Sequence, residues 1–276
     1  MPRVIQTLKH ALIALKSNPV LFIPKIFLAL LWSFFLLEVI KLFIELQKIN
    51  LQIQAYGAGE LNAFIAKTFF LLGIAIALFV VDTIVNATYP LMLKAFYEKK
   101  KPSFWHSLSR VLKNSPSIVF PVIAAFLLSI AVIMPFVLLF VQSFASNNSL
   151  GQIVFAVLLL AMVFIVSIAT FFIYPIAVLE KKGFSSILQS VRSARKNLKP
   201  VSVGVLITYA LSVSTAFLGV AAGSSSLAGS LLSISSIIIF FGLRIVTVVT
   251  STYSIILNPA IYFEYEKKMK LKGELN

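Results

Sequence analysis

Long apolar stretches separated by short polar or basic segments dominate the sequence. A transmembrane helix needs about 20 mostly apolar residues, and helices satisfy every backbone polar group internally, as lipid requires. The pattern therefore predicts an all-α fold, a polytopic membrane bundle of six transmembrane helices forming a single membrane domain over residues 1–276. The six stretches run approximately over Val20–Leu46, Ala63–Leu93, Ile118–Phe144, Ile153–Leu179, Val201–Ala222 and Leu231–Phe263.

A different pattern precedes the first, third and fifth stretches. Residues 4–19, 104–116 and 184–200 each place apolar side chains at helical spacing, with basic and polar residues between them, and each ends at a proline. Helices of this kind lie in the headgroup plane of a membrane. The apolar positions include Leu8, Leu12, Leu15, Trp105, Leu108 and Leu112. The basic positions, which we expect to bind lipid headgroups, are Lys9, Lys16, Arg110, Lys113, Arg192, Arg195, Lys196 and Lys199.

Proline spacing indicates an internal repeat. Pro90, Pro175 and Pro259 lie near the ends of the second, fourth and sixth stretches, at intervals of 85 and 84 residues. Each is expected to kink its helix, because proline removes a backbone donor and its ring displaces a carbonyl. We therefore predict three tandem two-span repeats, each preceded by a cytoplasmic interfacial amphipathic helix. Their bounds are approximately 3–100, 101–183 and 184–266, followed by a basic cytoplasmic tail over 267–276.

The distribution of basic residues sets the expected topology. The chain has 24 Lys and Arg residues and only nine acidic ones. Twenty of the 24 lie before or at the start of the first stretch, between the second and third, between the fourth and fifth, or after the sixth. By the positive-inside rule this side is cytoplasmic. We expect a multi-pass protein of the cytoplasmic membrane with both termini in the cytoplasm and anionic lipid headgroups as partners. Because the charge brackets apolar spans, nucleic acid is excluded as a partner.

Counting back eight residues from the three prolines gives Asp82, Ser167 and Ser251, which then share one depth. A carboxylate deep in a bilayer costs at least about 2.5 kcal/mol unless it is paired, protonated or hydrated. Asp82, with Asn86 one turn away, is therefore the leading candidate for a proton, cation or headgroup site. The four residues form a candidate intramembrane polar site. The alternative is that they only supply hydrogen bonds between helices.

The obvious candidate to neutralise Asp82 is Arg244. Arg244 lies about 10 Å away from it in depth, so this pair requires a register shift or a tilt. Otherwise Arg244 is expected to extend to the outer surface. Lys25 lies near the cytoplasmic end of the first stretch and is also expected to extend towards the headgroups.

Catalytic constellations are not evident in the sequence. The chain has no cysteine, and its two histidines, His10 and His106, lie on the basic segments without a neighbouring carboxylate. We therefore expect no enzymatic activity, no metal and no cofactor. The leading hypothesis is a protein that interacts with or moves lipids or other amphiphiles. Alternatives are an accessory or scaffold subunit, with a protein partner or a second copy at the small-residue segment Gly219–Gly229, and an ion or small-solute transporter that uses Asp82.

Three short motifs resemble a known family. They are Ser17-Asn-Pro19, the stretch Tyr174–Ser190 and the stretch Tyr253–Tyr262. Together they resemble the six-helix membrane domain found fused to some glycerophosphoryl diester phosphodiesterases, in YciC-type envelope proteins and in uncharacterised archaeal membrane protein families. The resemblance implies a prokaryotic cytoplasmic membrane protein linked to lipids or the envelope. We do not expect phosphodiesterase activity, because the resemblance covers the membrane domain and not the phosphodiesterase domain.

Overall fold

The computed structural model describes residues 2–51, 58–146, 148–227 and 234–267, which are almost entirely helical. Most of the predicted basic tail therefore lies outside the described residues, as do the side chains of Gly219–Gly229. The elements are α1 (Pro2–Ser17), η1 (Pro19–Phe22), α2 (Ile23–Leu51), α3 (Ala58–Asn86), α4 (Thr88–Tyr97), α5 (Phe104–Lys113), α6 (Ser115–Ala145), α7 (Ser149–Thr170), α8 (Ile173–Leu179), α9 (Ser185–Lys196), α10 (Leu198–Leu227), α11 (Ile234–Ile261) and η2 (Tyr262–Lys267).

Six helical segments of the described chain are long and apolar enough to cross a membrane. At most 39% of the residues in the most apolar part of any of them are buried, so most of their surface is available to lipid. The all-helical prediction is therefore confirmed for the described residues, and six helical segments are compatible with a multi-pass membrane protein. The segments are Pro19–Leu42, Asn62–Tyr97, Ser115–Ala145, Ser149–Leu179, Leu198–Phe217 and Phe241–Tyr265.

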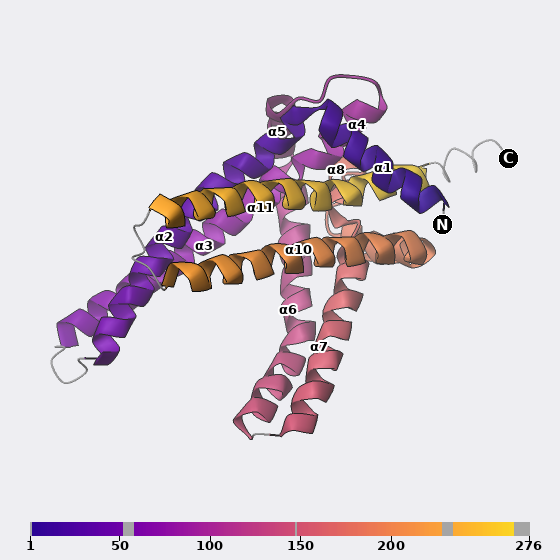
Figure 1. The fold of residues 1–276 in the computed structure, drawn as a ribbon. Coiled ribbons are helices and arrows are strands. Elements are labelled where there is room, and N and C mark those ends of the chain that lie inside the picture. The colour runs from indigo at the N-terminus through magenta and orange to yellow at the C-terminus, as the bar shows by residue number, and fades with distance from the viewer. Residues whose placement is uncertain (1, 52–57, 147, 228–233, 268–276) are drawn as a thin grey trace.

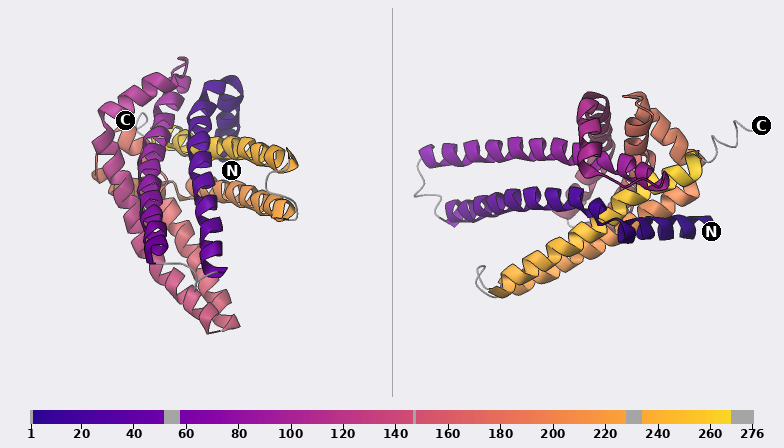
Figure 2. Two further views of the ribbon diagram at one scale, coloured as in Figure 1. Left: turned by 90° about the vertical axis from the view of Figure 1, so that its left-hand side faces the viewer. Right: turned by 90° about the horizontal axis from the view of Figure 1, so that it is seen from above.

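The long helices form three hairpins that spread in different directions from a common end (Figures 1 and 2). The hairpins are α2–α3, α6–α7 and α10–α11. The shorter helices α1, α4, α5, α8 and α9 gather with the end of α11 where the hairpins meet, and we call this region the hub. Neighbouring hairpins also touch in a closed ring, because α3 packs on α6, α7 on α10 and α11 on α2.

The hub contains the best-buried core of the protein. Its largest fully buried side chains include Tyr89, Phe172, Leu21, Met92 and Leu257. The biggest apolar cluster joins α1, η1, α2, α4, α5 and α11, and a second joins the ends of α7 and α11 to α8, α9 and α10. Because these contacts connect all three hairpins, we infer that the hub holds them in their relative positions.

Two of the three even-numbered spans are interrupted just before their proline. α3 ends at Asn86 and α4 begins at Thr88, so the break coincides with the carbonyl that Pro90 cannot pair. Similarly, α7 ends before Phe171, four residues ahead of Pro175. In the last span, α11 continues through Pro259 to Ile261 and then widens into the π-type turn η2.

A surface helix closes the second of these breaks. Ser190 of α9 donates a hydrogen bond from Oγ to the carbonyl of Ala169 at 2.8 Å. Its oxygen also accepts one from the backbone N–H of Phe172 at 3.1 Å. Both backbone groups belong to the interrupted turn between α7 and α8. Since an unpaired buried backbone group costs about 1–3 kcal/mol, Ser190 compensates for the break.

The surface helices α1, α5 and α9 all bury small side chains, and α1 and α5 also bury Leu15, Phe104 and Val111. α1 packs on α11, α5 on α4, and α9 on α7 and α8, through side chains such as Ala14, Ser107 and Ser190. Leu12 and Trp105 are each more than half exposed. The apolar positions predicted for these helices are therefore only partly buried: Leu15 lies in the core, whereas Leu12 and Trp105 are exposed.

Candidate functional site

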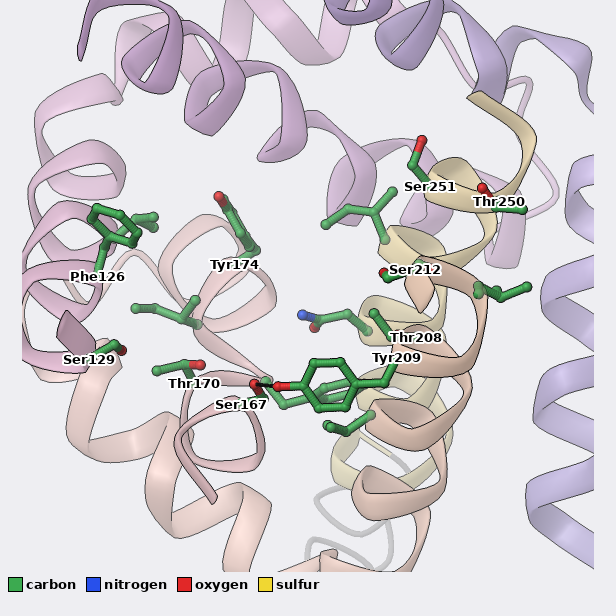
Figure 3. A pocket seen from close by; sticks show the side chains of 18 of the residues that line it. Phe126, Ser129, Ser167, Thr170, Tyr174, Thr208, Tyr209, Ser212, Thr250 and Ser251 are labelled. Carbon is green, nitrogen blue, oxygen red and sulfur yellow. Dashed lines mark hydrogen bonds between the residues drawn. The ribbon is translucent and has the colours of Figure 1, made fainter. Parts of the chain in front are cut away.

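A cavity of about 700 Å³ lies among the three hairpins. Side chains of α6, α7, α8, α10 and α11 line it (Figure 3). Phe79 from α3 and Lys25 from α2 complete the lining. Every hairpin therefore contributes to its wall. The cavity is partly open to its surroundings rather than sealed.

Hydroxyl groups make up much of the wall of this central cavity. Half of the 24 described residues that line it are Ser, Thr or Tyr, although they belong to strongly apolar spans. Phe126, Val122, Leu211 and Ile255 provide apolar surface beside them. The hydroxyl-bearing residues are Ser129, Ser167, Thr170, Tyr174, Thr208, Tyr209, Ser212, Thr215, Thr247, Thr250, Ser251 and Ser254.

Many of these hydroxyls donate to the backbone of their own helix. Thr170 Oγ1 donates to the carbonyl of Val166 at 2.9 Å, and Thr247 Oγ1 to that of Leu243 at 2.8 Å. A hydroxyl bound in this way satisfies its donor without leaving the helix and keeps its oxygen lone pairs for another partner. The wall can therefore accept hydrogen bonds from a ligand, or donate to one after a rotation of the hydroxyl.

Two hydroxyl pairs join neighbouring helices across the wall. Ser167 of α7 and Tyr209 of α10 lie 2.5 Å apart between their oxygens (Figure 3), and Tyr209 also donates to the carbonyl of Val163. Thr215 of α10 and Thr250 of α11 lie 3.2 Å apart. Ser167 thus makes an interhelical hydrogen bond and lines the cavity, so the two roles weighed from the sequence do not exclude each other.

The four residues of the sequence-predicted polar site divide into two groups. Ser167 and Ser251 line the central cavity, whereas Asp82 and Asn86 do not. Asn86 Nδ2 donates to Asp82 Oδ2 at 2.6 Å, and Lys25 Nζ lies 3.9 Å from Asp82 Oδ1. Lys25 lines the cavity with Ser167 and Ser251 and also pairs with Asp82, so it belongs to both groups of residues.

The partner of Asp82 is therefore Lys25, which differs from the expectation that Lys25 extends to the headgroups. Its side chain is only 15% exposed. A signal for this pair was present in the sequence. Lys25 lies six residues after Pro19 and Asp82 lies eight before Pro90, so their depths differ by only about 3 Å along antiparallel helices.

Arg244 lies elsewhere, lining a second cavity of about 680 Å³ between α2 and α11. The other residues of that cavity are apolar apart from Ser33. No ion pair joins Arg244 to Asp82 among the described contacts, consistent with the difference in depth inferred from the sequence.

The side chains that α10 contributes to the cavity were not predicted from the sequence. The predicted polar positions came only from the prolines of the even-numbered spans, and α10 is an odd-numbered span. Thr208, Ser212 and Thr215 follow one another at spacings of four and three residues, which places them on one face of a helix. This polar face within an apolar span is the sequence signal that predicts the part of the cavity wall formed by α10.

The cavity also contains an unpaired polar group. The amide oxygen of Asn258, on α11, is buried without a hydrogen-bond partner in the described part of the chain. The amide oxygen of Asn86 is in the same state beside Asp82. Buried polar atoms of this kind are uncommon in native proteins and call for an explanation such as a water or a ligand.

The eight basic residues predicted to bind headgroups are all exposed. They lie on α1, α5, α9 and the first turn of α10, around the hub. His10, on α1, lies 3.7 Å from Glu264 of η2, measured from Nδ1 to Oε1. Within the described residues, no three His, Asp or Glu side chains converge on one point as a metal site requires.

No family model matches the chain, and no curated protein or solved structure matches it. Function must therefore be inferred from the cavity and the side chains that surround it.

Proposed function

We propose that this protein is a non-enzymatic protein of the cytoplasmic membrane that binds a membrane lipid or another amphiphile in its central cavity. The observation that carries this proposal is the concentration of twelve hydroxyl residues around one cavity in otherwise apolar spans. Polar groups in a membrane span cost free energy unless they find partners. A ligand with a polar head and an apolar tail satisfies both the hydroxyls and the apolar residues beside them.

In this proposal the hub faces the cytoplasm. Its exposed basic residues support this orientation, because lysine and arginine concentrate on the cytoplasmic side of membrane proteins. The large exposed side chains of the surface helices, such as Trp105 and Leu12, would then reach into the headgroup region. Both features suit helices that lie on an anionic membrane surface.

The proposal also includes the threefold repeat. Its best support is a shared hydrogen bond at the end of each surface helix. Asn18, Asn114 and Asn197 each donate from Nδ2 to the carbonyl four residues earlier, at distances of 3.2, 3.0 and 3.0 Å. The same bond recurs before each hairpin. We further propose that the chain belongs to the six-helix membrane-domain family that it resembles.

A tryptophan placed in the cavity tests the proposed function. Ser212→Trp is expected to weaken binding of a monoacyl lipid at least tenfold, because the indole occupies the space of the ligand. Binding to the purified protein in phosphatidylcholine nanodiscs can be measured by native mass spectrometry. Ser214→Trp is the matched control, since Ser214 is exposed on the same helix and does not line the cavity. Equal binding by both variants contradicts the proposal.

The ion pair behind the cavity supports a second candidate, transport of an ion or small solute. Acidic side chains within membrane spans often mark ion pathways. If Asp82 binds a transported cation or proton, Asp82→Asn is expected to abolish substrate-dependent flux into liposomes. Flux equal to that of the unmodified protein excludes this candidate. Asn is a suitable replacement because it keeps an oxygen that can accept the hydrogen bond from Asn86.

A further inference from the structure

Among the described residues, Lys25 is the only charged one that lines the central cavity. Its nearest acidic oxygen, Asp82 Oδ1, is 3.9 Å from Nζ, which is too long for a hydrogen bond. Among the described residues no side chain accepts a hydrogen bond from this ammonium. Lysine carries three N–H donors, so its donors are available to a ligand in the cavity.

The geometry of the pair gives the cavity a positive side. Asp82 does not line the cavity, and its Oδ2 already accepts a hydrogen bond from Asn86. The carboxylate thus lies behind the ammonium, where it compensates the charge of Lys25 without facing the ligand. In surroundings of low polarity, charges and charged hydrogen bonds interact more strongly than in water. A negatively charged headgroup is therefore favoured next to Lys25.

We infer that the central cavity selects anionic amphiphiles, with Lys25 donating hydrogen bonds to a phosphate or carboxylate head. This inference rests on the proposed function and names its class of ligand. Asp82 is the counter-ion that neutralises Lys25 while the cavity holds no anion, and a bound headgroup takes over this role. The hydroxyls of Ser251 and Ser212 are placed in the same wall to bind oxygen atoms of the linker between head and tail.

Asp82 distinguishes this inference from cation transport, because the two assign opposite effects to the same variant. As a counter-ion, Asp82 competes with an anionic ligand for Lys25, so its removal strengthens anion binding. As a cation site, Asp82 is required for binding.

The experiment measures binding of four probes to purified protein in phosphatidylcholine nanodiscs. Lysophosphatidate and a fatty acid are the anionic amphiphiles, a monoacylglycerol of equal chain length is the neutral one, and inorganic phosphate is the free anion. We expect the anionic amphiphiles to bind at least tenfold more tightly than the monoacylglycerol. Lys25→Gln is expected to remove this preference by weakening binding of the anionic amphiphiles, while Asp82→Asn retains or increases it.

Lys67→Gln is the control for the loss of one positive charge, since Lys67 pairs with Glu45 in the first hairpin and does not line the cavity. It is expected to leave the preference intact. If either single variant fails to fold, the double variant Lys25→Gln/Asp82→Asn is expected to bind all acyl probes equally.

The failures of the inference and of the proposed function differ. An anion preference that survives Lys25→Gln, or is lost in Asp82→Asn, overturns the inference, while the proposed function stands as long as Ser212→Trp weakens binding of every acyl probe. Binding of inorganic phosphate without binding of any acyl probe supports an anion site, but it overturns the proposal that the ligand is an amphiphile. Binding of no probe overturns both.

Discussion

Replacing Leu257 by alanine is expected to lower the free energy of unfolding by about 2–5 kcal/mol, as found for large-to-small changes in packed cores. Leu257 lies on α11 in the hub, is fully buried, and packs in the cluster that includes Leu21, Tyr89 and Met92. Truncation leaves a cavity where α11 meets the first hairpin. The loss can be measured by titrating the protein in mixed micelles with a denaturing detergent and following circular dichroism and tryptophan fluorescence.

Ile245→Ala on the same helix is the matched control. Its side chain is 66% exposed on a span whose surface largely faces lipid, so its truncation is expected to change the free energy of unfolding by less than about 0.5 kcal/mol. If both variants have the same stability, the hub is not what holds the hairpins together.

The second large effect concerns the ion pair of Lys25 and Asp82. Removing one member of a buried pair leaves the other uncompensated and costs about 3–5 kcal/mol. Asp82 keeps 28% of its side chain exposed, so a smaller cost of about 1–3 kcal/mol is expected for Lys25→Met or Asp82→Asn alone. The double variant is expected to recover most of this loss, because neither charge of the pair is then left without its partner.

A double-mutant cycle, measured by the same micelle titration, isolates the coupling between the two residues. The sum of the losses of unfolding free energy in the two single variants is expected to exceed the loss in the double variant by about 1 kcal/mol or more. Additive costs would show that the two charges do not interact and that Lys25 does not need Asp82 as its counter-ion. The cycle reports on stability alone and is independent of any ligand.

The even-numbered spans show how far local pattern can lead. Pro90 and Pro175 were recognisable in the sequence, and α3 and α7 end four or five residues before them, since a proline cannot pair the carbonyl four residues earlier. The hydroxyl group that closes the second break is that of Ser190, on a separate surface helix. Ser190 lies 18 and 21 residues along the chain from the two groups that it contacts. It reaches them because α9 packs on α7 and α8, and no local pattern specifies such a contact.

The candidate site was predictable only in part for the same reason. Ser167 and Ser251 follow from counting along the even-numbered spans, and both line the cavity. Tyr209 and Lys25 lie on other spans, and their relation to Ser167 and Asp82 depends on which helices meet and at what depth. Residue spacing gives depth along a helix, but it does not give the rotation of one helix towards another.

The sequence by itself determined the number of apolar spans, the positions of the surface helices and the side on which basic charge gathers. These follow from the length and polarity of local segments, because a bilayer imposes its thickness on each span separately. Only the tertiary structure decided that Lys25 rather than Arg244 pairs with Asp82, that α9 attaches to the hub through small side chains such as Ser190 and Ala194, and that hydroxyls from separate hairpins surround one cavity. In lipid, apolar surface has no preferred partner, so the mutual arrangement of the spans is set by side-chain fit and by polar contacts between distant residues.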